Sequence, residues 1–298
     1  MTLKKLTFKS LSLGLGILFF IAGCVSGNKE PGKETADSMK KDTASEGFTK
    51  AKKVFYSLPS PAESAMMLKR AGAVYDEKIL NPVDNAGKYV SRKSMALNLG
   101  IFICDLSYTS LFEKTQISLR YMNAAKKLAD GLGIPDAIND DIIKRIEANQ
   151  NNKEEIMNII SETFMNSNSY LSPEVASVVV VGGWVEGMYL ATQLVDKKSL
   201  VKNELANRII DQHLTMETVI TLLDKYKGND DILSLAKDLS DLKLEFDKIK
   251  INAPAVVAEK NEKNNVTTLK SKSEVTVTPE VFESICKKIE TIRNSYIK

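Results

Sequence analysis

One apolar segment, Ser172 to Val195, constrains the fold of this chain more than any other feature. Outside the N-terminus, only this stretch is apolar on nearly every face, as expected of a helix surrounded by other protein. It opens with Ser-Pro-Glu, a start signal in which serine caps the first turn and proline fits the first helical position. Beyond that turn it holds one carboxylate, Glu186. We predict a central buried helix around which the rest of the chain packs.

The N-terminus has the pattern of a secretory signal. Three lysines precede an apolar run, residues 11 to 21, which is too short to span a hydrocarbon core of ~30 Å. The run ends in Ile21-Ala22-Gly23-Cys24, which resembles the bacterial lipobox. The resemblance implies cleavage after residue 23 and acylation of Cys24, and two or more acyl chains anchor a protein stably. The alternative is an ordinary cleaved signal followed by a chance cysteine.

Residues 24 to 50 are interpreted as the acylated N-terminus and a flexible tether. The segment is polar, mixed in charge and nearly without aliphatic residues, so it cannot bury enough apolar area to order itself. Its expected span is on the order of 30 Å. In some bacteria an aspartate directly after the acylated cysteine retains a lipoprotein in the inner membrane. Val25 occupies that position here, which favours the outer membrane, with the periplasmic face and the cell surface both left open.

The charge of the mature chain argues against a nucleic-acid partner. Three of the 41 basic residues lie in the signal, so 38 remain against 38 acidic residues. Nucleic-acid binding domains normally carry a basic excess.

Residues 51 to 298 are predicted to form one all-α domain, a multi-helix array around the central helix. Apolar residues recur at helical spacing between short connections, a pattern typical of antiparallel neighbours. Residues 252 to 278 break this pattern with alternating valine and threonine, which predicts an extended or β segment near 255–277, and a last helix is expected from 279 to 298. The other expected helices are Ser60–Tyr75, Asn85–Leu111, Lys114–Gly131, Ala137–Asn149, Lys153–Tyr170, Lys202–Lys227 and Asp230–Ile251.

Several runs together resemble an uncharacterised lipoprotein family of Bacteroidota. The runs are Phe55-Tyr56-Ser57-Leu58-Pro59-Ser60-Pro61, Ala71-Gly72-Ala73-Val74-Tyr75, Leu80-Asn81-Pro82, Leu97-Asn98-Leu99-Gly100, Asp105-Leu106-Ser107-Tyr108 and Gly182-Gly183-Trp184-Val185-Glu186-Gly187. The resemblance implies a source and a location, and no activity.

Two carboxylates in apolar segments are the main site candidates. Asp105 lies on a face with Asn98, and Glu186 on a face with Tyr189 and Gln193. A buried carboxylate is unfavourable unless it is paired or hydrogen-bonded. Two such acids facing one cavity can divide acid and base roles or bind a polar ligand, whereas acids satisfied by Tyr, Arg or Lys would only fix helix register. The candidate pocket or buried polar network comprises Asn98, Asp105, Tyr108, Trp184, Glu186, Tyr189 and Gln193.

Other motifs carry weaker signals. Gly183 and Gly187 have the spacing that lets another helix approach closely. His213 is the only histidine and makes a poor zinc set with its neighbouring carboxylates. Cys104 and Cys286 lie on apolar helical faces, where buried thiols and a disulfide are the two alternatives.

The sequence thus predicts a lipid-anchored protein of the cell envelope that acts as a non-catalytic binding or scaffolding module. Expected partners are membrane lipid, through Cys24, and a protein or small-molecule ligand. No catalytic residue, metal or cofactor is predicted. The alternative is a helical hydrolase or lyase that uses the buried carboxylates in a central pocket.

Overall fold

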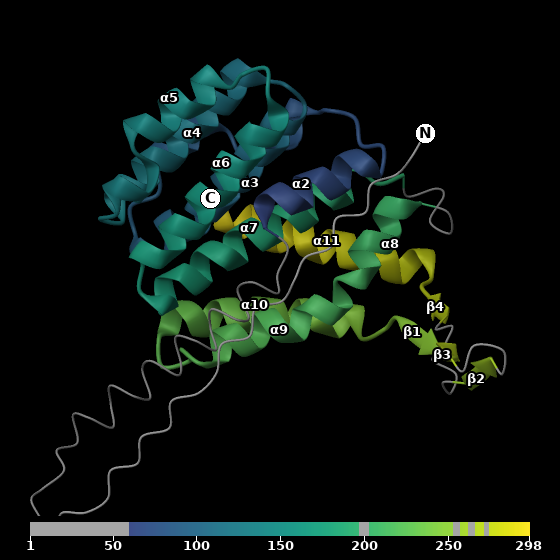
Figure 1. The fold of residues 1–298 in the computed structure, drawn as a ribbon. Coiled ribbons are helices and arrows are strands. Elements are labelled where there is room, and N and C mark those ends of the chain that lie inside the picture. Colours follow the sequence, from purple (N-terminus) through teal and green to yellow (C-terminus); the bar gives the residue numbers. More distant parts are fainter. Residues whose placement is uncertain (1–59, 197–202, 253–256, 262–265, 271–273) are drawn as a thin grey trace, which may run out of the picture. The chain divides into compact units, whose positions relative to one another are not determined.

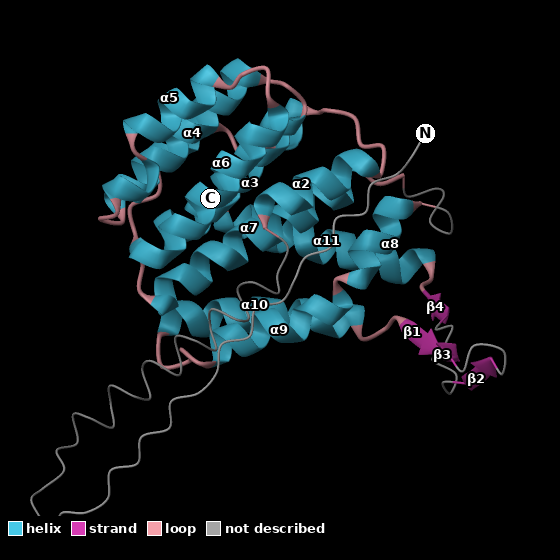
Figure 2. Cartoon of the chain, viewed as in Figure 1, coloured by secondary structure: helices cyan, strands magenta, loops and turns pink. Residues whose placement is uncertain are grey.

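The computed structural model describes residues 60–196, 203–252, 257–261, 266–270 and 274–298, all within one compact unit, Ala44–Lys298. The predicted signal, Cys24 and the tether therefore lie outside the described residues. Figures 1 and 2 show a helical array with a small β-ribbon. Its α-helices are α2 (Pro61–Arg70), α3 (Arg92–Leu111), α4 (Thr115–Gly131), α5 (Asp140–Ala148), α6 (Lys153–Tyr170), α7 (Pro173–Leu194), α8 (Glu204–Asp211), α9 (His213–Asp224), α10 (Asp230–Phe246) and α11 (Pro279–Tyr296), and its 3-10 turns are η1 (Glu77–Ile79), η2 (Val83–Gly87) and η3 (Pro135–Ile138).

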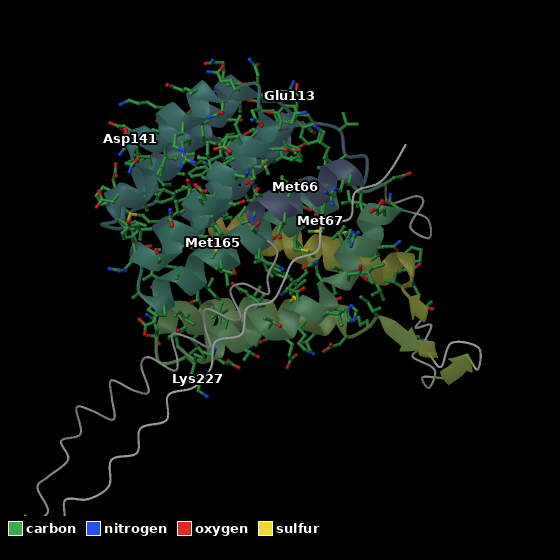
Figure 3. The ribbon with its side chains drawn as sticks, in the orientation of Figure 1. Met66, Met67, Glu113, Asp141, Met165 and Lys227 are labelled. Carbon is green, nitrogen blue, oxygen red and sulfur yellow. The ribbon has the colours of Figure 1, made fainter. Side chains whose placement is uncertain are left out.

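The predicted all-α array with a central apolar helix is confirmed. The central helix is α7, which is buried from Ala176 to Thr192. Its main partner is α3, buried from Ala96 to Leu111, and the two helices share the largest interface in the described unit. Helices α2, α4 and α6 also pack on α3, while α11 packs on α7 and α10, and α9 packs on α10 (Figure 1). Charged side chains such as Asp141 of α5 and Lys227 lie on the outside of this array (Figure 3).

Glycines allow α3 and α7 to cross closely. A Cβ atom on Gly100 would lie 2.0 Å from the carbonyl oxygen of Val179, and one on Gly182 would lie 2.0 Å from that of Leu97. The prediction of a tight crossing is therefore right, but its residues were only partly right. Gly183 does face Gly100, whereas Gly187 faces Ser64 of α2. The decisive glycine on α7 is Gly182.

Local signals set the helix starts. The Ser60 side chain accepts a hydrogen bond from the Glu63 amide at 3.2 Å, and the Ser60 amide donates to the Glu63 carboxylate at 2.7 Å, which completes a capping box. Pro173 and Pro279 occupy the first turns of α7 and α11. The side chain of Thr278 also accepts from the Val281 amide.

Several predicted helices were too long. The helix from Ser60 ends at Arg70 because the chain turns at Gly72, whose φ of +83° favours glycine. The pattern from Asn85 divides into η2 and α3, because Ser91 caps a new helix with its hydroxyl on the Ser94 amide. The pattern from Lys202 divides into α8 and α9 at Gln212, where the Gln212 amide donates to Ile209 in a tighter turn. The α10 helix also ends at Phe246, before the predicted Ile251.

The predicted extended segment forms two antiparallel strand pairs. Strand β1 (Lys250–Asn252) pairs with β4 (Glu274–Thr276), and β2 (Val257–Asn261) pairs with β3 (Val266–Lys270). Both pairs lie between α10 and α11 along the chain, and they form two separate two-stranded sheets (Figure 2). Of the two alternatives, an extended segment and a β segment, the β segment is correct for the described strands.

Among the described residues, α7 alone is long and apolar enough to cross a membrane. In the fold, 89% of that apolar window is buried inside the protein. Its apolar character is therefore explained by its place between α3, α11 and α2.

Candidate functional site

The centre of the site is an ion pair between α7 and α11. Nε of Arg293 donates to Oε2 of Glu186 at 2.9 Å, and Nη2 donates to Oε1 at 3.0 Å. Glu186 is 0% exposed and Arg293 is 4% exposed. A two-pronged contact of this kind matches the planar guanidinium to both carboxylate oxygens. It therefore fixes the rotation of α11 relative to α7.

Arg293 has two further partners. Nη2 also donates to the backbone carbonyl of Ile79 at 3.2 Å, and the guanidinium carbon lies 4.3 Å from the ring centre of Tyr189. Burial lowers the pKa of the guanidinium, but the charges of Glu186 and Asp105 outweigh burial and leave the pKa above its ordinary value. Arg293 is therefore a permanent cation in the core.

Asp105 of α3 is a second fully buried carboxyl beside this pair. Its Oδ2 accepts the backbone amide of Asn81 at 3.1 Å, while Oδ1 has no hydrogen-bond partner among the heavy atoms. The charge of Glu186 also acts on this carboxyl and disfavours its ionised form.

The surroundings of Asp105 favour its protonated, neutral form. Burial, followed by the charge of Glu186, raises the pKa of Asp105 well above its ordinary value, and Arg293 only partly opposes this effect. With Asp105 protonated, the single positive charge of Arg293 balances the charge of Glu186.

Asn81 connects the acids to the rest of the core. The side-chain amide of Asn81 donates to the Tyr89 hydroxyl at 3.0 Å and to Oδ1 of Asn98 at 3.1 Å. Its backbone carbonyl accepts from the Tyr121 hydroxyl at 2.9 Å. The residue is 0% exposed, so these contacts satisfy polar groups that water cannot reach. The short Leu80–Pro82 stretch thus enters the interior as part of the network.

The network also ends the last helix. The side-chain amide of Asn98 donates to the carbonyl of Tyr296 at 2.9 Å, and the Tyr89 hydroxyl donates to the carbonyl of Ile297 at 3.2 Å. These carbonyls belong to the C-terminal turn, where helices lack internal donors. The α11 helix is therefore attached to the core at two levels, by Arg293 and by its final carbonyls.

Four of the seven predicted site residues belong to this network: Asn98, Asp105, Glu186 and Tyr189. Tyr108 instead binds the backbone around Asp76 and stacks on Tyr75, with ring centres 5.4 Å apart. Trp184 donates from its indole to Gln212 at 3.2 Å, and the Gln193 amide donates to the Thr192 hydroxyl at 3.4 Å. The structure therefore brings four of the predicted residues together and places Tyr108, Trp184 and Gln193 elsewhere.

The sequence reasoning missed Arg293, Asn81, Tyr89 and Tyr121. A signal for Arg293 was present, because it follows Cys286 and Ile289 at helical spacing on the apolar stripe of the last helix. A cation on such a stripe needs a buried acidic partner. Asn81 and Tyr89 lie outside regular α-helix, where periodicity gives no indication of burial.

The described cavities lie away from the acids. One cavity, of about 310 Å³, lies where α3, α7 and α10 begin, and its charged residues balance: Arg92 and Lys93 against Glu174 and Asp231. A second, of about 200 Å³, is lined by residues between Glu77 and Asp84 together with Arg120 and Tyr121. Neither Asp105 nor Glu186 lines either cavity.

The weaker candidates have ordinary surroundings. Nδ1 of His213 lies 2.8 Å from the Ile210 carbonyl oxygen within its own chain turn. Within the described ranges no three of the His, Cys, Asp and Glu side chains are placed to hold one metal ion. Cys104 and Cys286 are both buried and are not joined in a disulfide, so buried thiols are the correct alternative.

No family model, no curated protein and no solved structure matches this chain. The residues of the chain itself therefore carry the argument on function.

Proposed function

We propose that this protein is a lipid-anchored component of the cell envelope that acts as a non-catalytic binding or scaffolding module. The observation that carries the proposal is that the two acids best suited to chemistry are enclosed. A catalytic acid or base must reach the proton that it transfers, directly or through one water. Asp105 and Glu186 are each 0% exposed, and Arg293 occupies both oxygens of Glu186.

The anchor follows from the lipobox resemblance at Ile21 to Cys24. Acylation of Cys24 would attach the mature chain to the membrane, and the polar residues up to 50 would hold the helical unit near it. Val25, after the cysteine, supports an outer-membrane location. The equal numbers of acidic and basic residues in the mature chain support a protein or small-molecule partner over nucleic acid.

A helical hydrolase or lyase is the alternative. One observation favours it, since a protonated carboxyl beside an ionised one is an arrangement used in general acid–base chemistry. It would require an opening from the surface to Asp105, and neither cavity of 310 Å³ or 200 Å³ provides one. The structural role of the acids, fixing the helices relative to one another, is therefore preferred.

The anchor is tested by labelling cells with a clickable palmitate analogue. The wild type should carry the label and sediment with membranes, and Cys24→Ala should lose both properties. Cys104→Ala and Cys286→Ala are matched controls, because their buried thiols should leave labelling unchanged. Label on the Cys24→Ala variant, or none on the wild type, would contradict the anchor.

The binding role is tested by cross-linking in native membranes and identifying what co-purifies. Wild type and Asp105→Asn should recover the same protein or ligand, since the isosteric amide keeps the shape of the core. The alternative would be supported if purified wild type converted an envelope substrate and Asp105→Asn and Glu186→Gln did not. That outcome would refute a non-catalytic role.

A further inference from the structure

The cavity of about 310 Å³ where α3, α7 and α10 begin has the size of a small-ligand site. Three of the residues that line it, Ala96, Val178 and Ile232, are apolar and buried, and they form what we call its apolar wall. Charged residues with exposed side chains also line it, among them Arg92 and Glu174. A cavity with one apolar and one charged side suits a small molecule that has both kinds of surface.

Two of the four charged residues at this cavity already serve the fold. Nζ of Lys93 lies 3.9 Å from Oδ1 of Asp231 and also donates to the Ser234 hydroxyl. Because Lys93 is in the first turn of α3 and the other two residues are on α10, these contacts join the two helix starts.

Arg92 and Glu174 have no such role. Within the described part of the chain, neither side chain makes a hydrogen bond or an ion pair, and they do not pair with each other. Arg92 is the first residue of α3, where a cation opposes the helix dipole, so the stability of α3 does not account for it. Glu174 is favourable in the first turn of α7 but has no cationic partner. Opposite charges thus line one cavity without meeting.

The hydroxyl of Ser172 is a third group without a partner at this cavity. Ser172 precedes α7, but its side chain makes no capping hydrogen bond. At the other two helix starts the capping side chains are occupied, since Ser91 accepts from the Ser94 amide and Asn229 from the Asp231 amide. The Ser172 hydroxyl is therefore free to donate to an anion in the cavity.

We propose that this cavity binds a small zwitterion of the α-amino acid class, with its carboxylate on Arg92 and Ser172, its ammonium on Glu174 and its side chain on the apolar wall. A guanidinium offers two parallel donors to a carboxylate. A simple anion would also meet the like charges of the two acids, and a simple cation those of Arg92 and Lys93, so a ligand with both charges fits best. This inference rests on the proposed binding role and gives it a ligand class.

The test is ligand-observed NMR of the purified mature protein with each of the common L-amino acids. At least one should bind saturably. Its N-acetyl derivative, which lacks the ammonium, and its amide, which lacks the carboxylate, should each bind about tenfold more weakly or worse, because each leaves a charged group unpaired.

Two variants assign the charges. Glu174→Gln should bind the free amino acid and its N-acetyl derivative equally, and Arg92→Gln should bind the amino acid and its amide equally. Both residues are exposed and unpaired, so both variants should keep the wild-type melting temperature. Arg120→Gln is the matched control, because Arg120 is an exposed arginine that lines the 200 Å³ cavity, and its loss should leave the affinity unchanged.

The zwitterion site is overturned by any of three results: no L-amino acid binds, the N-acetyl derivative or the amide binds the wild type as tightly as the free amino acid, or either Arg92→Gln or Glu174→Gln keeps the wild-type affinities. Such a result would leave the palmitate labelling and the cross-linking of a protein partner as they stand, so it is distinguishable from failure of the proposed binding role.

Discussion

The central helix makes two contacts, one helical turn apart, that depend on opposite properties. At Gly182, α7 meets α3 with backbone in direct contact, because neither Gly182 nor Gly100 of α3 has a side chain to separate the helices. At Glu186, α7 meets α11 through a buried charge and the long side chain of Arg293. The contact at Gly182 has no titratable group, whereas the contact at Glu186 is an ion pair of two titratable groups.

The difference shows why one helix can serve both as the core and as a polar site. Close packing of α3 on α7 tolerates no added atom but is indifferent to pH. The contact with α11 tolerates a change of shape but requires that charges balance, since an unpaired buried charge is strongly unfavourable. The face of α7 toward α3 is therefore closely packed, and the face toward α11 is the one that responds to a change of charge.

The largest expected effect is at the charged contact. Arg293→Met keeps an apolar chain in place but leaves Glu186 and Asp105 without their cation, so the free energy of unfolding should fall by about 3–5 kcal/mol. Urea denaturation measures this change. Arg145→Met is the control, because Arg145 is paired on the surface with Glu162 and its loss should change stability by about 0.5 kcal/mol or less. Equal effects of the two variants would remove the distinction between the contacts.

The glycine contact should respond next most strongly. In Gly182→Ala the new methyl group would meet the Leu97 carbonyl oxygen at 2.0 Å, so the two backbones must separate. We expect a loss of about 3 kcal/mol, the upper end for overpacking. The measurement is urea denaturation at pH 5 and pH 8, where the loss should be the same at both values. A loss that changed with pH would show that the two contacts are coupled.

A smaller effect should appear in the pH dependence of the wild type. A raised pKa in the folded state means that stability falls as pH rises from the ordinary aspartate value to the folded one, by at most about 1.4 kcal/mol per pH unit for one proton. The carboxyls of Glu245 and Glu280 have lowered pKa values, and their contributions are already complete above the ordinary glutamate pKa, about 4.3. Denaturation at several pH values should show this decline in the wild type and in Gly182→Ala.

Asp105→Asn isolates the contribution of the site. Asp238 also has a raised pKa through burial, so part of the decline belongs to it. The difference in stability between wild type and Asp105→Asn should increase with pH. A constant difference would mean that Asp105 holds no proton in the folded state.

The smallest change in stability should be at Gly228, a glycine that, unlike Gly182, lies at no helix crossing. A Cβ there meets nothing within 4 Å. Gly228→Ala should therefore be neutral or stabilising by about 0.5 kcal/mol, because alanine restricts the unfolded chain. Thermal unfolding is the check, and a large loss would show that helix crossings are not the reason for glycine sensitivity in this protein.

Most of the helical fold was predictable because its causes are local. Caps such as Ser60 and Thr278 and the apolar periodicity of each helix depend on residues within a few positions of one another. Where a boundary was wrong, as at Gln212, no nearby residue marks the break, and the Gln212 side chain is instead bound by Trp184, 28 residues away. The extended segment was also predicted, but which of its strands pair with one another is seen only in the structure.

The sequence by itself determined that α7 would be a buried helix and that its one internal carboxylate would need a partner, because both follow from the cost of exposing apolar surface and of burying charge. Only the tertiary structure decided which partner that is. Arg293 lies 107 residues from Glu186, and Asp105 joins them from a third helix. Periodicity describes one helix at a time, whereas the balance of two acids against one cation exists only where three helices meet.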